Sequence, residues 1–264
     1  MQLWDQHRYF CILGGYMDKL LWVAMSGAKE NFNSLAVRSN NLANASTTGF
    51  KADFENSRAM SVFANAYPTR AFAMVERPGY NMDDGALETT GRALDLAIKG
   101  SGMFAVSDKQ GQEAYTRFGS LKIDENGVLK TSNGLDVLDE DGTQIVLPMP
   151  LEDVAINTDG VITGRPQGAD RNVIEVYQRI KLVNEDIKNI EKGYDGLFRR
   201  IDGMQIAQDP TIRVESGALE ASNVNPVEEL TSLIRIQRQY DTQVKLMETA
   251  SQMDQTQNNL MAYE

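Results

Sequence analysis

The chain of 264 residues contains one histidine, His7, and one cysteine, Cys11. A single thiol cannot form a disulfide within the chain, and this scarcity excludes Cys/His zinc sites and catalytic triads that need histidine. Basic residues are in the minority, with 26 Lys and Arg against 37 Asp and Glu and a formal charge of −11, which argues against bulk affinity for nucleic acid. No apolar run reaches the ~18 to 20 residues that span a bilayer, so we expect no membrane-spanning segment.

The composition of the whole chain is that of an ordinary globular protein, with 42% hydrophobic residues. The length allows one large domain or two small ones. The first sixteen residues differ from the rest, because they hold the only His, the only Cys and one of the two tryptophans. We expect residues 1–16 to be a non-native or disordered N-terminal extension, with Met17 as the functional start. A cleaved signal peptide fits less well, since Asp18 and Lys19 interrupt the apolar run.

A long helix is predicted over residues 17–45. Its apolar side chains are spaced alternately by four and three residues, with Ser39 as the one polar break in that register. This spacing places them on one narrow stripe, which is typical of the seam of a coiled coil. The predicted seam residues of this helix are Leu21, Met25, Ala28, Phe32, Leu35 and Leu42.

A second long helix is predicted within residues 214–264, after a short lead-in. Asn225 is a capping residue, Pro226 suits the first helical position and Glu228 is placed to complete a capping box. Apolar residues then recur at steps of three and four, interrupted by Gln237: Leu230, Leu233, Tyr240, Val244 and Met247. We expect the two helices to form a coiled-coil pair; the alternative is that both pack on an ordinary core.

The central part of the sequence predicts β structure. Tight-turn dipeptides lie between alternating apolar and polar segments, at Asn126-Gly127, Asn133-Gly134, Asp141-Gly142 and Asp159-Gly160. Residues 75–213 are therefore predicted to form a central antiparallel, hairpin-rich β domain. Residues 46–74, rich in Ser, Thr, Asn and Ala, are predicted to be an extended connector, and the expected fold class is α+β.

Two short motifs suggest cofactor or metal binding but fit those sites poorly. Gly100-Ser101-Gly102 follows a predicted strand, yet the third glycine of a dinucleotide fingerprint is missing and the next residues alternate like a strand. Asp139-Glu140-Asp141-Gly142 is similar to part of a calcium loop, but Val137 and Pro148 occupy ligand positions. We expect both motifs to be turns, and we expect no catalytic residue, no metal site and no cofactor.

The segment Asn40-Asn41-Leu42-Ala43-Asn44-Ala45-Ser46-Thr47-Thr48-Gly49-Phe50-Lys51 resembles the signature that ends the N-terminal helix in bacterial flagellar rod and hook proteins. Residues 85–100, 217–225 and 237–240 are similar to further stretches of the same family, and together the matches extend from Met17 to the end of the chain. Residues 17–21 and 24–28 resemble the members that form the proximal rod more than the distal rod or hook subunits. The signature residues of interest are Asn41, Leu42, Ala43, Asn44, Thr48, Gly49, Phe50 and Lys51.

This resemblance implies a structural subunit of the flagellar basal-body rod that has no enzymatic activity and transmits torque from motor to hook. It implies export through the flagellar type III apparatus without a cleaved signal, and assembly in the periplasm with other rod proteins and with copies of itself. Within the signature, Gly49 can adopt the positive φ that ends a helix, and Phe50 can pack back on the last turn.

A competing interpretation is a stand-alone β-domain binding or adhesin-like module with a helical stalk. Such a module would need an aromatic platform on its sheet. The candidates for this platform are Phe104, Tyr115, Phe118 and Tyr177.

Overall fold

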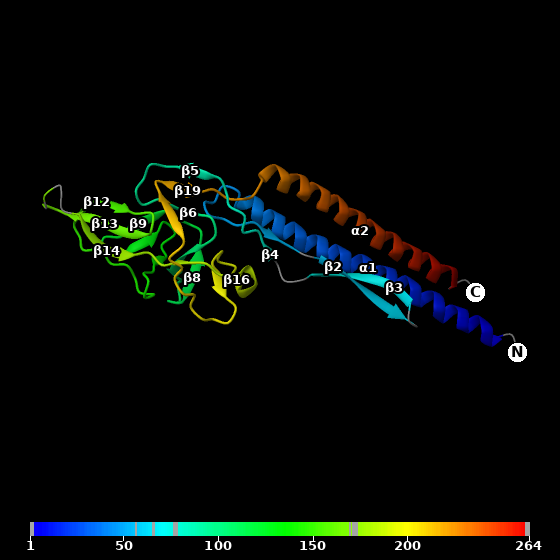
Figure 1. The fold of residues 1–264 in the computed structure, drawn as a ribbon. Helices are drawn as coiled ribbons and strands as arrows, with labels where there is room; N and C mark the ends of the chain where they lie inside the picture. The colour runs from blue at the N-terminus through cyan, green and yellow to red at the C-terminus, as the bar shows by residue number, and fades with distance from the viewer. Residues whose placement is uncertain are drawn as a thin grey trace. The chain divides into compact units, whose positions relative to one another are not determined.

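A computed structural model describes residues 3–55, 57–64, 67–75, 79–168, 170 and 174–261, which form two compact units (Figure 1). The helical unit comprises Met1–Ala43, Asp53–Gly79 and Asn225–Glu264. The β unit comprises Asn44–Ala52 and Tyr80–Val224. The fold class is α+β, with a long helix in the N-terminal and in the C-terminal part of the chain and antiparallel strands in the sequence between them.

Two helices, α1 (Leu3–Ala43) and α2 (Pro226–Met261), run antiparallel and side by side in the helical unit (Figure 1). The helix that was expected to start at Met17 begins at Leu3. No proline precedes Met17, and Gly14 and Gly15 cost a helix only about 1 kcal/mol each, so the helical backbone continues through them. The assignment of residues 1–16 as a non-native extension stays a prediction.

The second helix begins at Pro226, the position that the capping residues indicate. The Asn225 Oδ1 accepts hydrogen bonds from the backbone N–H groups of Val227 (3.1 Å) and Glu228 (3.4 Å). Among the described residues the Glu228 carboxylate makes no hydrogen bond in return. The start of α2 is therefore capped from the Asn225 side alone.

The first helix ends at Ala43, so Gly49 does not terminate it as expected. Two turns follow the helix instead, in which the Thr47 N–H donates to Asn44 O (3.0 Å) and the Phe50 N–H donates to Thr47 O (3.3 Å). Polar side chains compete with helical backbone bonds, and here the Thr47 hydroxyl also bonds the Asn44 side chain at 3.2 Å. Gly49 does have a positive φ of 67°, but it lies beyond the helix in the β unit.

The stretch that was expected to be an extended connector contains a hairpin. Strands β2 (Ser57–Ala64) and β3 (Tyr67–Val75) pair antiparallel, with Ser57 opposite Val75, and β3 lies against α1. The sequence offers no Asn-Gly or Asp-Gly pair here, which is why this hairpin was not predicted. Two shorter strands, β1 (Asp53–Phe54) and β4 (Gly79–Tyr80), also pair.

The β unit is built from antiparallel sheets. The largest has eight strands in the order β16-β17-β8-β7-β11-β10-β9, with β15 paired to β7. Its strands are β7 (Met103–Ser107), β8 (Glu113–Thr116), β9 (Leu121–Ile123), β10 (Leu129–Thr131), β11 (Asp136–Val137), β15 (Leu182–Val183), β16 (Ile190–Lys192) and β17 (Phe198–Arg200). A short 3-10 helix, η1 (Ile187–Asn189), precedes β16.

Three smaller sheets complete this unit. Strands β12 (Leu151–Ile156), β13 (Val161–Pro166) and β14 (Glu175–Arg179) form a three-stranded sheet. Strand β6 (Leu96–Lys99) pairs with β18 (Arg213–Ser216), and β5 (Leu87–Thr89) pairs with β19 (Ala218–Glu220). The last two strands return to the start of the unit, so the β structure continues beyond the expected boundary at residue 213.

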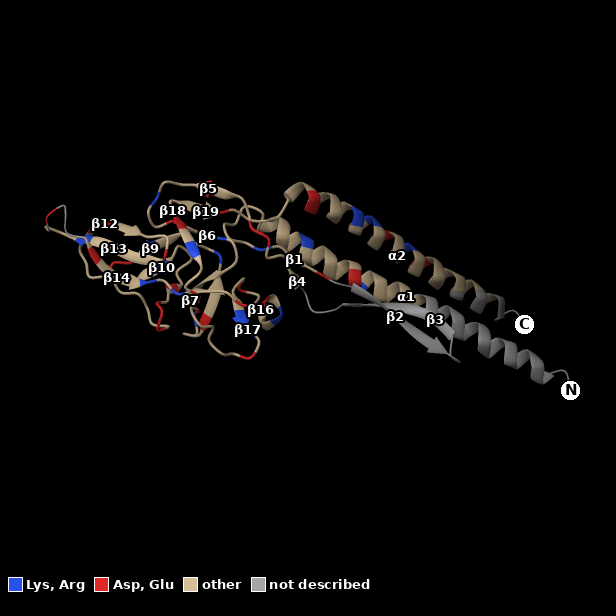
Figure 2. Ribbon diagram, viewed as in Figure 1, with Lys and Arg blue, Asp and Glu red and all other residues tan. Residues whose placement is uncertain are grey.

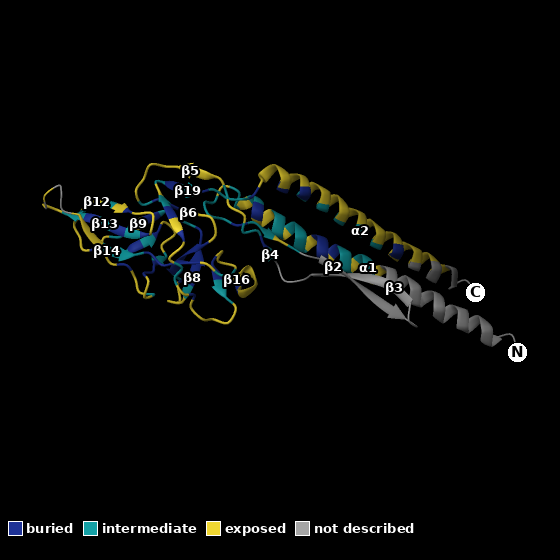
Figure 3. Ribbon diagram, viewed as in Figure 1, coloured by how far each residue is buried: buried dark blue, intermediate teal, exposed yellow. Residues whose placement is uncertain are grey.

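The expected turns close in the same way. In each one the glycine N–H donates to the carbonyl three residues earlier, from Gly127 to Asp124, Gly134 to Thr131, Gly142 to Asp139 and Gly160 to Asn157. The strands of this unit supply a buried core, part of which Figure 3 shows in dark blue around β8. Leu96, Phe104, Leu129 and Ile145 are each at most 1% exposed in its largest cluster. Burial of such apolar surface is the main stabilising contribution.

Candidate functional site

The residues of the predicted seam are divided between covered and open positions on the two helices. Ala28 is buried, and six others are half-buried: Leu35, Leu42, Leu233, Tyr240, Val244 and Met247. The remaining four are exposed: Leu21, Met25, Phe32 and Leu230. Figure 3 shows the same division, with much of α2 exposed to solvent. The helix pair by itself therefore leaves part of the predicted seam open.

Polar side chains make specific contacts between α1 and α2. The Asn31 Nδ2 donates to the Gln243 Oε1 at 2.9 Å, and the Arg38 Nη1 donates to the Glu229 Oε1 at 3.0 Å. Gly27 lies beside Gln243, and a Cβ at this position would be 2.6 Å from the Gln243 Nε2. Figure 2 shows both acidic and basic residues along α2.

Asn41 joins three segments of the helical unit. Its Nδ2 donates to Asp53 O (2.8 Å) and to the Glu229 Oε1 (3.1 Å), and its Oδ1 accepts from the Asp53 N–H (2.9 Å). The side chain is only 1% exposed, and these bonds satisfy a buried amide that would otherwise be costly. Asn41 thus ties the last turn of α1 to β1 and to the first turn of α2.

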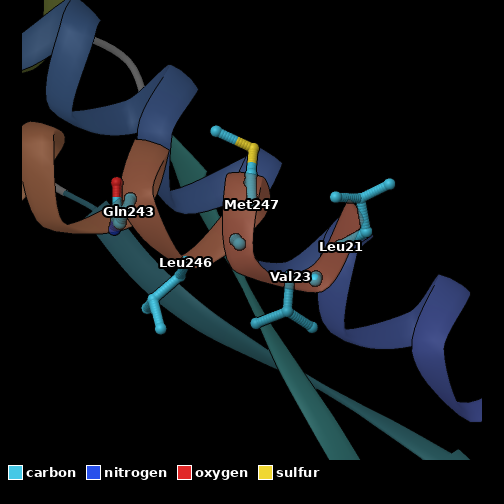
Figure 4. A pocket seen from close by; sticks show the side chains of 7 residues that line it. Leu21, Val23, Gln243, Leu246 and Met247 are labelled. Carbon is cyan, nitrogen blue, oxygen red and sulfur yellow. The ribbon is translucent and has the colours of Figure 1, made fainter. Parts of the chain in front are cut away.

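An apolar pocket of about 230 Å³ opens between the two helices, farther from Asn41 along the pair (Figure 4). Its labelled side chains are Leu21 and Val23 from α1 and Gln243, Leu246 and Met247 from α2. The Gln243 amide is the only polar group among these five side chains. The pocket therefore has the character of a socket for an apolar group and not of a catalytic site.

A buried ion cluster surrounds Lys51, the last residue of the signature, in the β unit. The Lys51 Nζ lies 2.7 Å from the Glu220 Oε1, and the two side chains are 0% and 2% exposed. The Arg117 Nε lies 3.3 Å from the Glu220 Oε2, and the Arg117 Nη2 donates to the Asp84 Oδ1 at 2.6 Å. Two cations and two carboxylates thus alternate, and only Asp84 has much contact with water.

Burial sets the electrostatics of this cluster. It lowers the pKa of the Lys51 ammonium below its ordinary value, and the neighbouring Arg117 guanidinium lowers this pKa further, while the Glu220 carboxylate opposes both effects. Lys51 is therefore held as a cation chiefly by its partner carboxylate. Removing that carboxylate would leave two positive charges in a site with little water.

Gly49 and Phe50 of the signature also lie in the β unit. Gly49 approaches the backbone of Arg117 so closely that a Cβ would lie 2.5 Å from its carbonyl carbon and oxygen. The Lys192 Nζ lies 4.0 Å from the centre of the Phe50 ring, a cation–π contact. Leu42, Asn44 and Thr48 are half-buried, and Ala43 is exposed at the end of α1.

Several residues of these two sites were not predicted. Glu229 and Gln243 lie on the expected second helix, but a search for apolar spacing passes over polar residues. Glu220 belongs to a stretch, residues 217–225, that was recognised for its family resemblance alone. Arg117 belongs to no motif, so only its position in the fold reveals its role.

The described residues contain no group of three or more His, Cys, Asp or Glu residues that could hold a metal ion. No helix among them is long and apolar enough to cross a membrane. Phe104 and Tyr115, two of the four candidates for the aromatic platform, are each 1% exposed and belong to the core, whereas Phe118 and Tyr177 are half-buried.

Three family models match the chain in succession. Residues 21–51 match the model described as flagella basal body rod protein, residues 97–164 match flagellar hook protein FlgE/F/G D1 domain, and residues 215–260 match flagellar basal body rod FlgEFG protein C-terminal. The first and third of these regions include Lys51 and Glu220. The matched regions therefore contribute both partners of the buried ion pair.

Curated relatives match along nearly the whole chain. The flagellar basal-body rod protein FlgF of Escherichia coli strain K12 is 36% identical over 252 residues, which cover 93% of this chain and 99% of that protein. FlgF of Caulobacter vibrioides is 34% identical, with coverages of 91% and 96%. The flagellar basal-body rod protein FlgG of Bacillus subtilis strain 168 is 30% identical, with coverages of 92% and 99%.

Proposed function

The chain belongs to the family of flagellar basal-body rod proteins, and on that premise we propose that it is a structural subunit of the proximal rod that polymerises through α1 and α2. The observation that carries this proposal is the distribution of side chains on the helix pair. Polar groups such as Asn31 and Glu229 are buried, whereas Trp22, Phe32 and Ile234 are 55 to 61% exposed. The helix pair therefore exposes large apolar side chains to solvent.

This exposed apolar surface is the driving force for assembly in the proposal. Trp22, Met25 and Phe32 lie within about three turns of α1, and Leu230 and Ile234 occupy neighbouring turns of α2. Burying one such side chain completely contributes about 1.5–3 kcal/mol. Extended exposed patches of this kind mark interaction surfaces in soluble proteins.

In a coiled-coil arrangement of the helices, the half-buried and the exposed seam residues have different packing partners. The half-buried seam residues, such as Leu35 and Val244, pack within the pair. The exposed ones, such as Phe32 and Leu230, pack against neighbouring subunits, and the pocket beside Leu246 receives an apolar side chain from such a neighbour. Both roles follow from one seam that the isolated pair covers only in part.

Packing of this kind is heterologous, since each subunit presents different faces to its predecessor and its successor. Such contacts generate a helical tube and not a closed ring. Many lateral helix contacts along a stiff tube provide a route for torque from motor to hook. The partners are other rod proteins and further copies of this chain.

The proposal includes export through the flagellar type III apparatus and assembly in the periplasm. Support comes from the family membership of the chain. The relatives bear the names of rod proteins, which are structural components.

The test is a charge placed on the exposed stripe. In cells that lack the native copy, Phe32→Asp should abolish motility in soft agar, and the variant should be missing from purified basal bodies. Phe32 is 61% exposed, so the substitution should leave the monomer folded, as measured by circular dichroism. The matched control is Ser101→Asp, which adds the same charge at an exposed turn of the β unit and should assemble normally. Normal incorporation of the Phe32 variant would overturn the assignment of the assembly surface.

A further inference from the structure

Three segments of the β unit meet at the buried ion cluster: residues 44–52, residues 81–86 and residues 217–224. The Lys51 ammonium has three N–H groups, and each finds an acceptor. These acceptors are Met82 O at 3.3 Å, Asp83 O at 2.7 Å and the Glu220 Oε1 at 2.7 Å. One side chain from the first segment therefore holds the other two.

Asn223 makes the corresponding contacts from the last segment. Its Oδ1 accepts from the Ala52 N–H at 2.8 Å, and its Nδ2 donates to Asn81 O at 2.9 Å and to Asp83 O at 3.0 Å. Asn223 thus bonds the first segment and the second segment at once. It carries no charge, so its contribution can be separated from that of the ion pair.

Backbone hydrogen bonds also connect the three segments. They run from the Gly49 N–H to Glu220 O (2.7 Å), from the Asn81 N–H to Ala52 O (2.8 Å) and from the Ala221 N–H to Ala86 O (2.8 Å). Each segment is bonded to both of the others. No segment can leave without breaking bonds of the remaining two.

The charges make partial opening more costly than opening of all three segments. If the first segment left alone, Glu220 would lose its ammonium partner and keep only the Arg117 guanidinium. If the last segment left alone, Lys51 and Arg117 would lose the carboxylate between them and keep only Asp84, whose side chain is 54% exposed. Loss of a charge partner in a buried site is destabilising, whereas opening of all three segments lets water reach the charged groups.

We propose that Lys51, Glu220, Arg117 and Asn223 form a latch that opens and closes as one piece, so that the three segments dock on the β unit or leave it together. The chain passes directly from the first and last of these segments into α1 and α2. The latch therefore fixes or releases the attachment points of both helices in a single step. This last consequence rests on the proposed function, but the latch itself is a property of the isolated chain.

Amide hydrogen exchange of the full-length monomer, followed by NMR, tests the latch without any assembly assay. The reporter amides are those of Gly49, Asn81 and Ala221, whose acceptors are given above. Asn223→Ala removes bonds to Ala52, Asn81 and Asp83 but none to Gly49 through its side chain. A latch that opens as one piece predicts that exchange at all three reporters rises by the same factor, at least tenfold. The amides of β7 and β8 should not change.

Lys51→Met provides the second variant, and it should raise exchange at the same three reporters by one common factor. The matched control is Lys181→Met, which removes the ammonium of another buried pair in this unit, Lys181 Nζ to Glu113 Oε1 at 2.8 Å, outside the latch. This control should leave the ratio of reporter exchange to β7 exchange unchanged. If Lys51→Met fails to fold, Asn223→Ala alone decides the question. Faster exchange confined to Asn81, with Gly49 unaffected, would overturn the proposal while leaving the assembly surface untouched.

Discussion

Lys51 and Glu220 lie 169 positions apart in the sequence, yet the Lys51 Nζ and the Glu220 Oε1 are 2.7 Å apart and both side chains are almost completely buried. The pair joins the end of the N-terminal signature to the stretch that precedes the C-terminal helix. Arg117 adds a second cation on the other side of the Glu220 carboxylate. The stability of the β unit should therefore depend more on the anion than on either cation.

Glu220→Gln should destabilise the β unit by about 3–5 kcal/mol, because it leaves two buried cations without the carboxylate between them. Lys51→Met should cost less, about 1–3 kcal/mol, since Glu220 keeps its contact with Arg117. Urea unfolding followed by circular dichroism measures both free energies of unfolding. Equal losses in the two variants would contradict a central role for the carboxylate.

Gly49→Ala should cost at least about 2 kcal/mol of unfolding free energy. The positive φ of 67° is unfavourable for alanine, and its Cβ would meet the Arg117 backbone at 2.5 Å. Gly134→Ala is a suitable control, because Gly134 has a φ of 89° and no heavy atom within 4 Å of the added Cβ. The control should lose only about 1 kcal/mol, the cost of the backbone conformation. Thermal unfolding of both variants separates the cost of the backbone conformation from the cost of the contact between the added Cβ and Arg117. Similar losses of unfolding free energy in the two variants would show that the close approach to Arg117 is unimportant.

Asn41→Ala should loosen the helical unit. The substitution removes hydrogen bonds to both backbone groups of Asp53 and to Glu229, at a cost of about 2–4 kcal/mol. Tryptophan fluorescence is the natural probe, since both tryptophans of the chain lie in α1. Ser39→Ala, at an exposed position of the same helix, should have little effect. If the two variants unfold at the same urea concentration, Asn41 does not tie α1 to its neighbours.

Acid should weaken the β unit through Asp108. Burial alone would raise the pKa of this carboxyl, but hydrogen bonds from Arg199 and from the N–H groups of Gln110 and Gln112 outweigh it and hold the pKa below its ordinary value. The folded protein then binds fewer protons than the unfolded chain, whose Asp titrates near ~3.9. The stabilisation is fully present above that pH and is lost as the pH falls through the lower, folded-state pKa.

Asp108→Asn should accordingly flatten the fall in stability below about pH 4, as measured by urea midpoints from pH 7 to pH 3. Glu88→Gln, at an exposed position of β5, should keep the acid dependence of the parent protein. An unchanged acid limb in the Asp108 variant would show that other carboxyl groups set the acid stability.

Local signals in the sequence predicted the elements whose cause is local. The start of α2 follows from Asn225 and Pro226, and the turn at Asp141-Gly142 closes within four residues. The seam was predicted less completely, because spacing identifies a stripe but not which part of it the chain itself covers. Phe32 and Ala28 belong to one stripe, yet the first is exposed and the second is buried.

The sequence by itself determined the two long helices, the hairpin-rich β unit and the lack of histidine or cysteine chemistry, since these depend on composition and on residues a few positions apart. Only the tertiary structure decided that Asn41 bonds Glu229, that Lys51 and Arg117 share Glu220, and that residues 57–75 pair as a hairpin. Those contacts depend on burial and on the meeting of distant segments. No spacing rule along the chain encodes where two such segments come together.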